Sequence, residues 1–195
     1  MFEESDLPKL KKLGVKDSKL LSIKKIHELA AEIKKIAKGY KTIEVLPEEI
    51  DRAVEGGDGL NLNWLEGVKQ AEIINELKPD KAIIDCPSPN IEVFKGFVSS
   101  KLKYKLILIL EHKAEKHLPV AAASILAKSR REEEVKKIEK LVGESIGSGY
   151  PSNHVCQDFL KRNYTKYPNL IRKSWSTYKV LNNKKAQKSL NEFEK

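Results

Sequence analysis

The sequence predicts an α/β fold with a helical C-terminal part, and three observations support this class. Two short aliphatic runs, Ala82–Asp85 and Tyr104–Leu110, have the length and composition of strands. The intervening stretch Cys86–Lys103 is long enough for a crossover, which predicts that the two strands are parallel neighbours. Helical patterns precede and follow the pair, as expected where helices flank a sheet.

In chain order, the first regular element is an amphipathic helix. It begins after Ser22, a good N-cap, and its apolar residues recur at helical spacing as far as Ala37. The β-branched run Thr42–Leu46 predicts a short strand, and Asn61 is expected to cap a second helix that ends before Pro79.

The second half of the chain is expected to hold a central strand and long helices. Tyr104–Leu110 is apolar on both faces, as is typical of a strand covered on each side. Pro119 opens a long helix to about Leu141, and three glycines then mark a loop. We expect three parts: an α/β core at 1–150, a helical part at 151–181, and a basic, loosely ordered tail at 182–195.

Composition narrows the class of protein. The longest uninterrupted aliphatic stretch, Leu106–Leu110, is far shorter than the roughly 18 residues of a membrane span. The chain starts with acidic residues and has two cysteines, unlike a secreted disulfide scaffold. These features predict a cytoplasmic, monomeric protein with reduced thiols and no membrane partner.

Positive charge is concentrated at the C-terminal end. The chain carries 37 basic and 28 acidic residues, and of its net charge of +9 the last 35 residues supply +8. Aromatic residues lie among these charges: Tyr164, Tyr167, Trp175 and Tyr178. Basic and aromatic side chains together suit a nucleic-acid-binding surface. A solvated helix followed by a lysine-rich tail would give the same pattern.

Two carboxylates are expected at the C-terminal edge of the parallel strands, where open α/β sheets bind ligands. Asp85 ends one strand and Glu115 follows the other. Carboxylate oxygens suit Mg²⁺ or Mn²⁺, which can activate water for phosphodiester cleavage. The alternatives are that Asp85 caps the turn before Cys-Pro-Ser-Pro and that Glu115 is an acid in a first helical turn.

Three other patterns are weaker. His112 and Glu115 have a spacing found in zinc sites, but no third ligand is evident. Ser124 and Lys128 are four residues apart, as in a Ser-Lys nucleophile pair, although helix surfaces often offer such pairs by chance. The Gly-Ser-Gly-Tyr-Pro loop could form an anion-binding nest with Tyr150 at its tip.

Taken together, five blocks in order resemble the ribonuclease HII family in its archaeal style, over about Leu10 to Leu181. The blocks are Leu13-Gly-Val-Lys-Asp-Ser-Lys19, Glu111-His-Lys-Ala-Glu115, Pro119-Val-Ala-Ala-Ala-Ser-Ile-Leu-Ala-Lys128, Gly147-Ser-Gly-Tyr-Pro-Ser152 and Arg172-Lys-Ser-Trp175. The resemblance implies a ribonuclease H-like mixed sheet flanked by helices. It also implies Mg²⁺- or Mn²⁺-assisted hydrolysis of RNA in RNA–DNA hybrids and of single ribonucleotides in DNA.

The resemblance also implies site residues. Asp85 matches the family's third active-site carboxylate, and Glu115 stands where the family has a fourth, an Asp. Tyr150 matches the tyrosine that packs on the sugar at the RNA–DNA junction, where the 2′-hydroxyl separates RNA from DNA. The positions expected to contact phosphates or support the site are Lys16, Lys19, Ser124, Lys128 and Arg172.

The chain departs from the family at three places. It has no Asp-Glu-Ala-Gly-Arg-Gly motif, which in the family lies on the first strand and supplies two ligands. Glu115 is longer than Asp by a methylene, and Asn153 replaces an acid. We expect the first strands to be missing from this chain. It is either a late-starting version of an active enzyme or a non-catalytic hybrid-binding protein.

Overall fold

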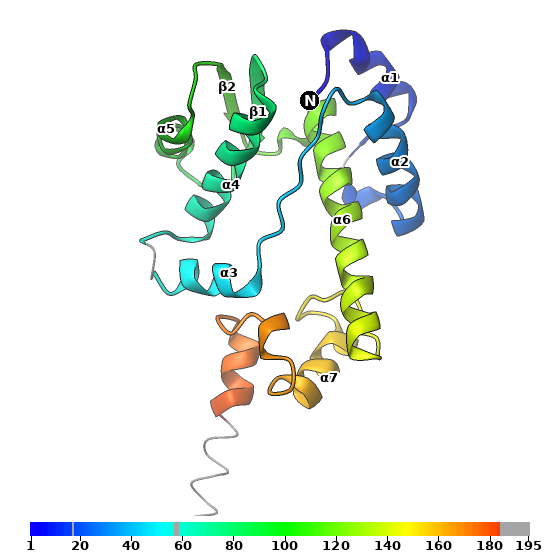
Figure 1. Cartoon of the computed structure of the whole chain (residues 1–195), viewed down its shortest axis with the longest axis vertical. Coiled ribbons are helices and arrows are strands. Elements are labelled where there is room, and N and C mark those ends of the chain that lie inside the picture. Colours follow the sequence, from blue (N-terminus) through cyan, green and yellow to red (C-terminus); the bar gives the residue numbers. More distant parts are fainter. Residues whose placement is uncertain (17, 57–58, 184–195) are drawn as a thin grey trace, which may run out of the picture. The chain divides into compact units, whose positions relative to one another are not determined.

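The computed structural model describes residues 1–16, 18–56 and 59–183, and Figure 1 shows their arrangement along the chain. The chain divides into two compact units. The first comprises Met1–Glu44 and Asn63–Glu133, and the second comprises Val45–Leu62 and Glu134–Lys195. None of the described helices is long and apolar enough to cross a membrane.

The first unit contains a parallel pair of strands, as predicted. Strands β1 (Lys81–Asp85) and β2 (Ile107–Glu111) pair in a register that sets Asp85 opposite Glu111. Helix α5 (Ile91–Lys101) forms the crossover between them, and its N-cap Asn90 accepts a hydrogen bond from the Val93 N–H at 3.1 Å. The two strands therefore end at the same edge of the sheet.

Helices α4 (Leu62–Leu77) and α5 contribute the core beside this sheet. Phe94 and Val98 of α5 are fully buried, and they join a cluster with residues of both strands. The other buried members are Ala71, Ile74, Ala82, Ile84, Cys86 and Leu110. The Trp64 ring stacks on Phe94 with a centroid distance of 5.7 Å.

A second core of the first unit is formed mainly by helices. It joins α1 (Leu7–Lys12), α2 (Ile23–Ile36) and the first turns of α6 (Leu118–Val142), with Val15 of the loop after α1 among its buried members. Its fully buried members include Leu10, Ile26, Ile33, Ala122 and Ile125. Ser22 caps α2 as predicted, because its side chain accepts a hydrogen bond from the Lys25 N–H.

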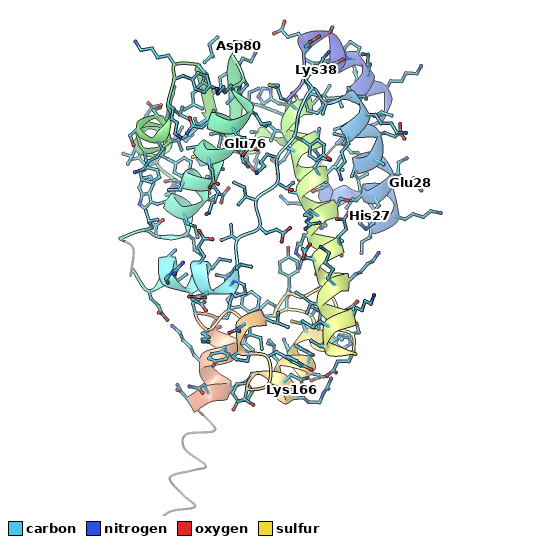
Figure 2. The ribbon with its side chains drawn as sticks, in the orientation of Figure 1. His27, Glu28, Lys38, Glu76, Asp80 and Lys166 are labelled. Atoms are coloured by element: carbon cyan, nitrogen blue, oxygen red, sulfur yellow. The ribbon has the colours of Figure 1, made fainter. Side chains whose placement is uncertain are left out.

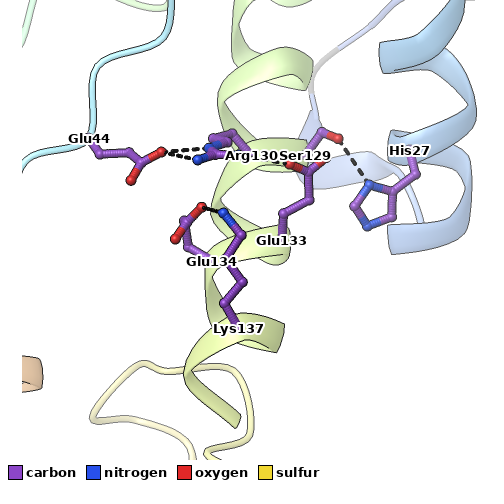
Figure 3. A network of polar contacts seen from close by, with 7 residues as sticks. All are labelled: His27, Glu44, Ser129, Arg130, Glu133, Glu134 and Lys137. Carbon is purple, nitrogen blue, oxygen red and sulfur yellow. Dashed lines mark hydrogen bonds and ion pairs between the residues drawn. The ribbon is translucent and has the colours of Figure 1, made fainter. Parts of the chain in front are cut away.

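Polar contacts of α6 fasten the neighbouring segments of this unit (Figure 3). His27 of α2 lies beside α6 (Figure 2), and its Nδ1 is 2.9 Å from the Ser129 hydroxyl. Arg130 donates to Glu44 at 2.6 Å and to Glu133 at 3.3 Å. Helix α6 thus contacts both α2 and the segment after α2 that contains Glu44.

The second unit contains the helices α3 (Pro47–Val54) and α7 (His154–Asn163) and a short 3-10 helix, η4 (Pro168–Leu170). Residues 176–183 are also helical. The buried core here is Cys156, Leu160 and Ile171, against which Tyr164 and Tyr178 pack edge to face at a centroid distance of 5.9 Å. The helices at 154–163, 168–170 and 176–183 agree with the helical character predicted for 151–181.

A buried carboxylate joins distant segments of the second unit. Asp51 of α3 is 8% exposed, and its two oxygens accept the backbone N–H groups of Lys173 at 2.8 Å and Ser174 at 2.9 Å. Burial would raise the pKa of Asp51, but hydrogen bonds from Ser174 and Lys173 and the charge of Arg172 outweigh it and lower the pKa.

Three expectations about strands were wrong in whole or part. Residues 41–46 form neither helix nor strand, so the strand predicted at Thr42–Leu46 is absent; a β-branched run becomes a strand only where a neighbouring strand accepts its hydrogen bonds. The strand expected at Tyr104–Leu110 begins at Ile107, which is 62% exposed, so it is not covered on both faces. The described sheet is a parallel pair, not a mixed sheet.

The division at residue 150 and the tail at 182–195 stay predictions. Residues 184–195 of that tail lie outside the described residues.

Two helical glycines give a matched test of the sheet core. A Cβ on Gly67 of α4 would lie 3.1 Å from the Phe94 ring, whereas one on Gly96 of α5 would meet nothing within 4 Å. We expect Gly67→Ala to lower the free energy of unfolding by about 1–3 kcal/mol through overpacking. Gly96→Ala should raise it by roughly 0.5–1 kcal/mol. Urea unfolding measures both, and equal effects would contradict the close packing at Gly67.

Asp51 should make the second unit sensitive to acid. Its folded pKa lies below the ordinary 3.8, so its contribution is complete above that value and disappears as the pH falls through the folded pKa. At pH 6, Asp51→Asn should reduce the free energy of unfolding by about 2 kcal/mol, because charged hydrogen bonds are lost. At a pH below the folded pKa of Asp51 the two proteins should converge.

Glu48→Gln is the matched control for this comparison, since Glu48 is exposed on the same helix and pairs only with Arg52 at 3.7 Å among the described residues. Its unfolding should match the wild type at both pH values. If the difference in free energy of unfolding between the wild type and Asp51→Asn persists unchanged in acid, the ionised Asp51 carboxylate does not stabilise the second unit as described.

Candidate functional site

Asp85 lies at the C-terminal edge of the sheet and is held by the neighbouring turn. It is the last residue of β1, and its Oδ1 accepts the backbone N–H of Ala114 at 3.2 Å. Ala114 is fully buried and opens the 3-10 helix η3 (Ala114–Lys116) that follows β2. Within the described residues Asp85 has no ion pair, so its negative charge is not balanced by a protein cation.

Glu115 is brought to the same edge by that turn. It directly follows the residue whose N–H binds Asp85, and its side chain is 18% exposed. The Lys19 ammonium lies 3.4 Å from Glu115 Oε1. A surface pocket of about 410 Å³ is lined by Lys19, Glu115 and two further lysines, Lys113 and Lys116. Asp85 and the turn that carries Glu115 thus lie at the same edge of the sheet, and their shared role at a metal stays a prediction.

Glu66 is a third carboxylate near this edge, and sequence reasoning missed it. Although the α4 residue as a whole is exposed, desolvation of its carboxylate raises the pKa, and the negative charge of Asp85 raises it further. Gln70 donates to Glu66 Oε1 at 3.0 Å and acts in the opposite direction. No motif distinguishes Glu66 from other helix-surface glutamates; its significance comes from the fold, which sets α4 beside β1.

The donor set suits a hard divalent cation that keeps water in its coordination shell. Such ions commonly bind one or two carboxylates and complete their shell with water and substrate phosphates. Asp85 offers an uncompensated carboxylate, and Glu115 a second one. The described ranges contain no group of three or more His, Cys, Asp or Glu arranged to hold a metal. His112 Nδ1 instead lies 3.1 Å from the Cys86 carbonyl, which gives the zinc alternative no support.

Ser124, one of the residues expected to support the site, is paired with a second serine. The hydroxyls of Ser18 and Ser124 are 2.8 Å apart, which ties η2 (Ser18–Leu20) to α6. Lys16 and Lys19 flank Ser18 in sequence and are exposed, and Lys128 lies one turn beyond Ser124 on α6. Ser124 therefore supports the segment that carries two lysines.

Tyr150 is presented by a loop that requires glycine. The residue is 49% exposed, and Gly147 and Gly149 on its N-terminal side have φ angles of +59° and +69°. A Cβ on Gly147 would stand 2.3 Å from the side-chain oxygen of Asn153. That oxygen caps α7 by accepting the Cys156 N–H at 3.2 Å. Asn153 thus serves as the N-cap of α7, a role that Asn and Asp fill equally well.

Arg172 lies in the segment that Asp51 holds. Its guanidinium stands over the Trp175 ring, 5.1 Å from the ring centroid. Its Nε is buried and lacks a hydrogen-bond partner among the described residues. A cation placed on an aromatic face keeps its remaining N–H groups available for an anion, which is the arrangement expected of a phosphate contact.

Comparisons with known proteins agree with this architecture. The family model described as "Ribonuclease HII" matches residues 1–178. A curated relative, ribonuclease HII of Thermococcus sibiricus, is 40% identical over 198 residues, which cover 98% of this chain and 85% of the relative.

Solved structures show the same fold. The ribonuclease H2 of Pyrococcus horikoshii superposes with a TM-score of 0.84 at 32% identity, covering 94% of this chain and 87% of that one. The Archaeoglobus fulgidus ribonuclease HII, solved as a complex with PCNA, gives 0.79 at 37% identity, covering 91% and 84%. A ribonuclease HIII solved with Mn²⁺ gives 0.74 at 19% identity, covering 92% and 61%, and is similar in fold.

The matched family model spans most of the sequence, and relatives of comparable length align along nearly all of it. The chain belongs to the ribonuclease HII family.

Proposed function

We propose that this chain hydrolyses RNA in RNA–DNA hybrids at the edge of the sheet where Asp85 and Glu115 lie. Membership of the ribonuclease HII family implies cleavage of the RNA strand of hybrids and of ribonucleotides embedded in DNA. The observation that carries the assignment to this edge is the Asp85 carboxylate, which is fixed by a backbone N–H and balanced by no protein cation in the described part of the chain.

When bound, Mg²⁺ or Mn²⁺ supplies charge neutralisation and activates water for attack on phosphorus. Residues of the chain orient the two carboxylates and set the charge around them. Ala114 holds Asp85 at one oxygen, and Lys19 balances Glu115 from the exposed side. Glu66 adds negative potential near Asp85, which favours a cation there. Asp85 and Glu115 are thus the proposed metal ligands.

Substrate binding is proposed to use charge for affinity and Tyr150 for selection. Lys16, Lys19 and Lys128 supply positive charge in the first unit, and Arg172 supplies it in the second. Phosphate contacts position a duplex without reading its chemistry. The 2′-hydroxyl is the group that identifies a ribonucleotide, and an exposed ring such as Tyr150 is suited to pack on its sugar.

A hybrid-binding protein without cleavage is the competing function, because the sequence contains no Asp-Glu-Ala-Gly-Arg-Gly motif. The two functions separate in one assay of this chain on a labelled hybrid with Mn²⁺ and with Mg²⁺. Metal-dependent fragments support the nuclease. Binding that weakens steeply with salt but yields no fragments supports the alternative.

Asp85→Asn tests the metal edge. The amide keeps the shape and the oxygen that can accept the Ala114 N–H, but it removes the charge. We expect Mn²⁺-dependent kcat to fall by about a hundredfold or more, since metal stabilisation of the transition state amounts to several kcal/mol. Hybrid affinity measured in EDTA should change little.

Asp80→Asn is the matched control, because Asp80 immediately precedes β1, at the opposite end from Asp85. It should leave cleavage unchanged. Undiminished activity of Asp85→Asn would remove Asp85 from the proposed ligands.

Tyr150→Ala tests selection of the ribonucleotide. Loss of a stacking ring costs about 1–3 kcal/mol, so cleavage at a single ribonucleotide in DNA should fall by about tenfold or more. Tyr150→Phe keeps the ring and should retain most activity. Tyr40, with a comparable 47% exposure, provides the control Tyr40→Ala. Equal losses in both alanine variants would point to a general effect on stability.

A further inference from the structure

Asp51 stands out among the carboxylates of the second unit because it is buried and both of its oxygens accept hydrogen bonds from the backbone of a distant loop. Its partners, Lys173 and Ser174, lie more than 120 residues further along the chain. Two consecutive N–H groups that converge on one anion are thereby fixed in direction. The segment between η4 and the helix at 176–183 has its path set by this interaction.

The fixed segment carries a cation with an incomplete set of partners. Arg172 precedes the two anchored amides, and its guanidinium stacks on Trp175 just beyond them. The backbone N–H of Trp175 donates a hydrogen bond to the backbone carbonyl of Arg172 at 3.3 Å, which closes the turn from Arg172 to Trp175. Ile171, on the other side of Arg172, is 4% exposed in the core. Arg172 is therefore held from three directions: by the core, by Trp175 and by Asp51.

We propose that Asp51 is a positioning residue for nucleic-acid binding: it holds the loop 172–175 so that the guanidinium of Arg172 can receive a backbone phosphate of the hybrid. The proposal rests on the proposed function, in which Arg172 contacts the substrate. Asp51 itself touches no nucleic acid, because its oxygens are occupied by the amides.

If Asp51 acts only through its charge, removing it should change the affinity for the hybrid in one direction; if it positions Arg172, the change should have the opposite sign. Removing a carboxylate from a polyanion-binding surface should tighten binding, because repulsion of phosphates is lost. If Asp51 positions Arg172, its removal should instead weaken binding, because a flexible arginine loses preorganisation. The sign of the change in hybrid affinity therefore distinguishes charge repulsion from positioning.

The test uses the full chain and a hybrid duplex in EDTA, so that binding is measured without cleavage. We expect Asp51→Ala to raise Kd about tenfold and to lower the slope of log Kd against log salt by about one, as for loss of one phosphate contact. Arg172→Ala should do the same, and the double variant should be no weaker than either. Asp51→Asn, which keeps one oxygen acceptor, should restore part of the affinity. Glu48→Gln should bind like the wild type.

Kinetics with Mn²⁺ give a readout that a general loss of structure would not reproduce. Asp51→Ala should raise KM while leaving kcat within about twofold, since the reacting groups are untouched. If the alanine variant unfolds, as its circular dichroism would show, Asp51→Asn carries the same comparison. Tighter binding, additive losses with Arg172→Ala, or a lowered kcat at unchanged KM would each overturn the proposal.

Failure of the proposed function would look different. A wild-type chain that neither binds nor cuts a hybrid would refute that function. A wild type that cuts, together with a weakened Arg172→Ala and an unaffected Asp51→Ala, would refute the positioning role alone.

Discussion

The parallel pairing of β1 with β2 is the constraint on which the proposed chemistry depends. Its register sets Asp85 opposite Glu111, so both strands end together and η3 turns back across the end of β1. Only then can the Ala114 N–H reach Asp85, and Glu115 directly follows Ala114 in the turn. A shift of one residue in the register would reverse the faces of the strand side chains and separate these groups.

Two carboxylates of this chain show how the same contact can serve different ends. Asp51 gives both oxygens to backbone N–H groups and is buried, which makes it a structural tie. Asp85 gives one oxygen to Ala114, is only partly buried, and has the charge of Glu66 nearby. Only one oxygen of Asp85 accepts a hydrogen bond from a described residue, whereas both oxygens of Asp51 do. The number of donors around each group accounts for the difference.

Local signals in the sequence predicted the elements that depend on local interactions. Ser22 was recognised as a cap because capping involves residues three apart, and the crossover between β1 and β2 followed from chain length and apolar composition. Thr42–Leu46 failed because strand formation requires a neighbour that composition cannot supply. Among the proposed site residues, Asp85 and Glu115 are predicted from their positions at and after the strand ends. Glu66 and Asp51 are not, because their partners lie far along the chain and come close only through the fold.

Gly147 links two tasks that are otherwise separate. Its left-handed backbone begins the loop that presents Tyr150, and its lack of a Cβ leaves room for the Asn153 side chain that caps α7. Fraying at the start of α7 would release Asn153 and with it the packing of the loop. The order of the Tyr150 loop and the integrity of the first turn of α7 are therefore parts of one local unfolding equilibrium. A side chain at residue 147 would be strained by the positive φ and would also displace Asn153, so it would disturb the Tyr150 loop and the cap of α7 together.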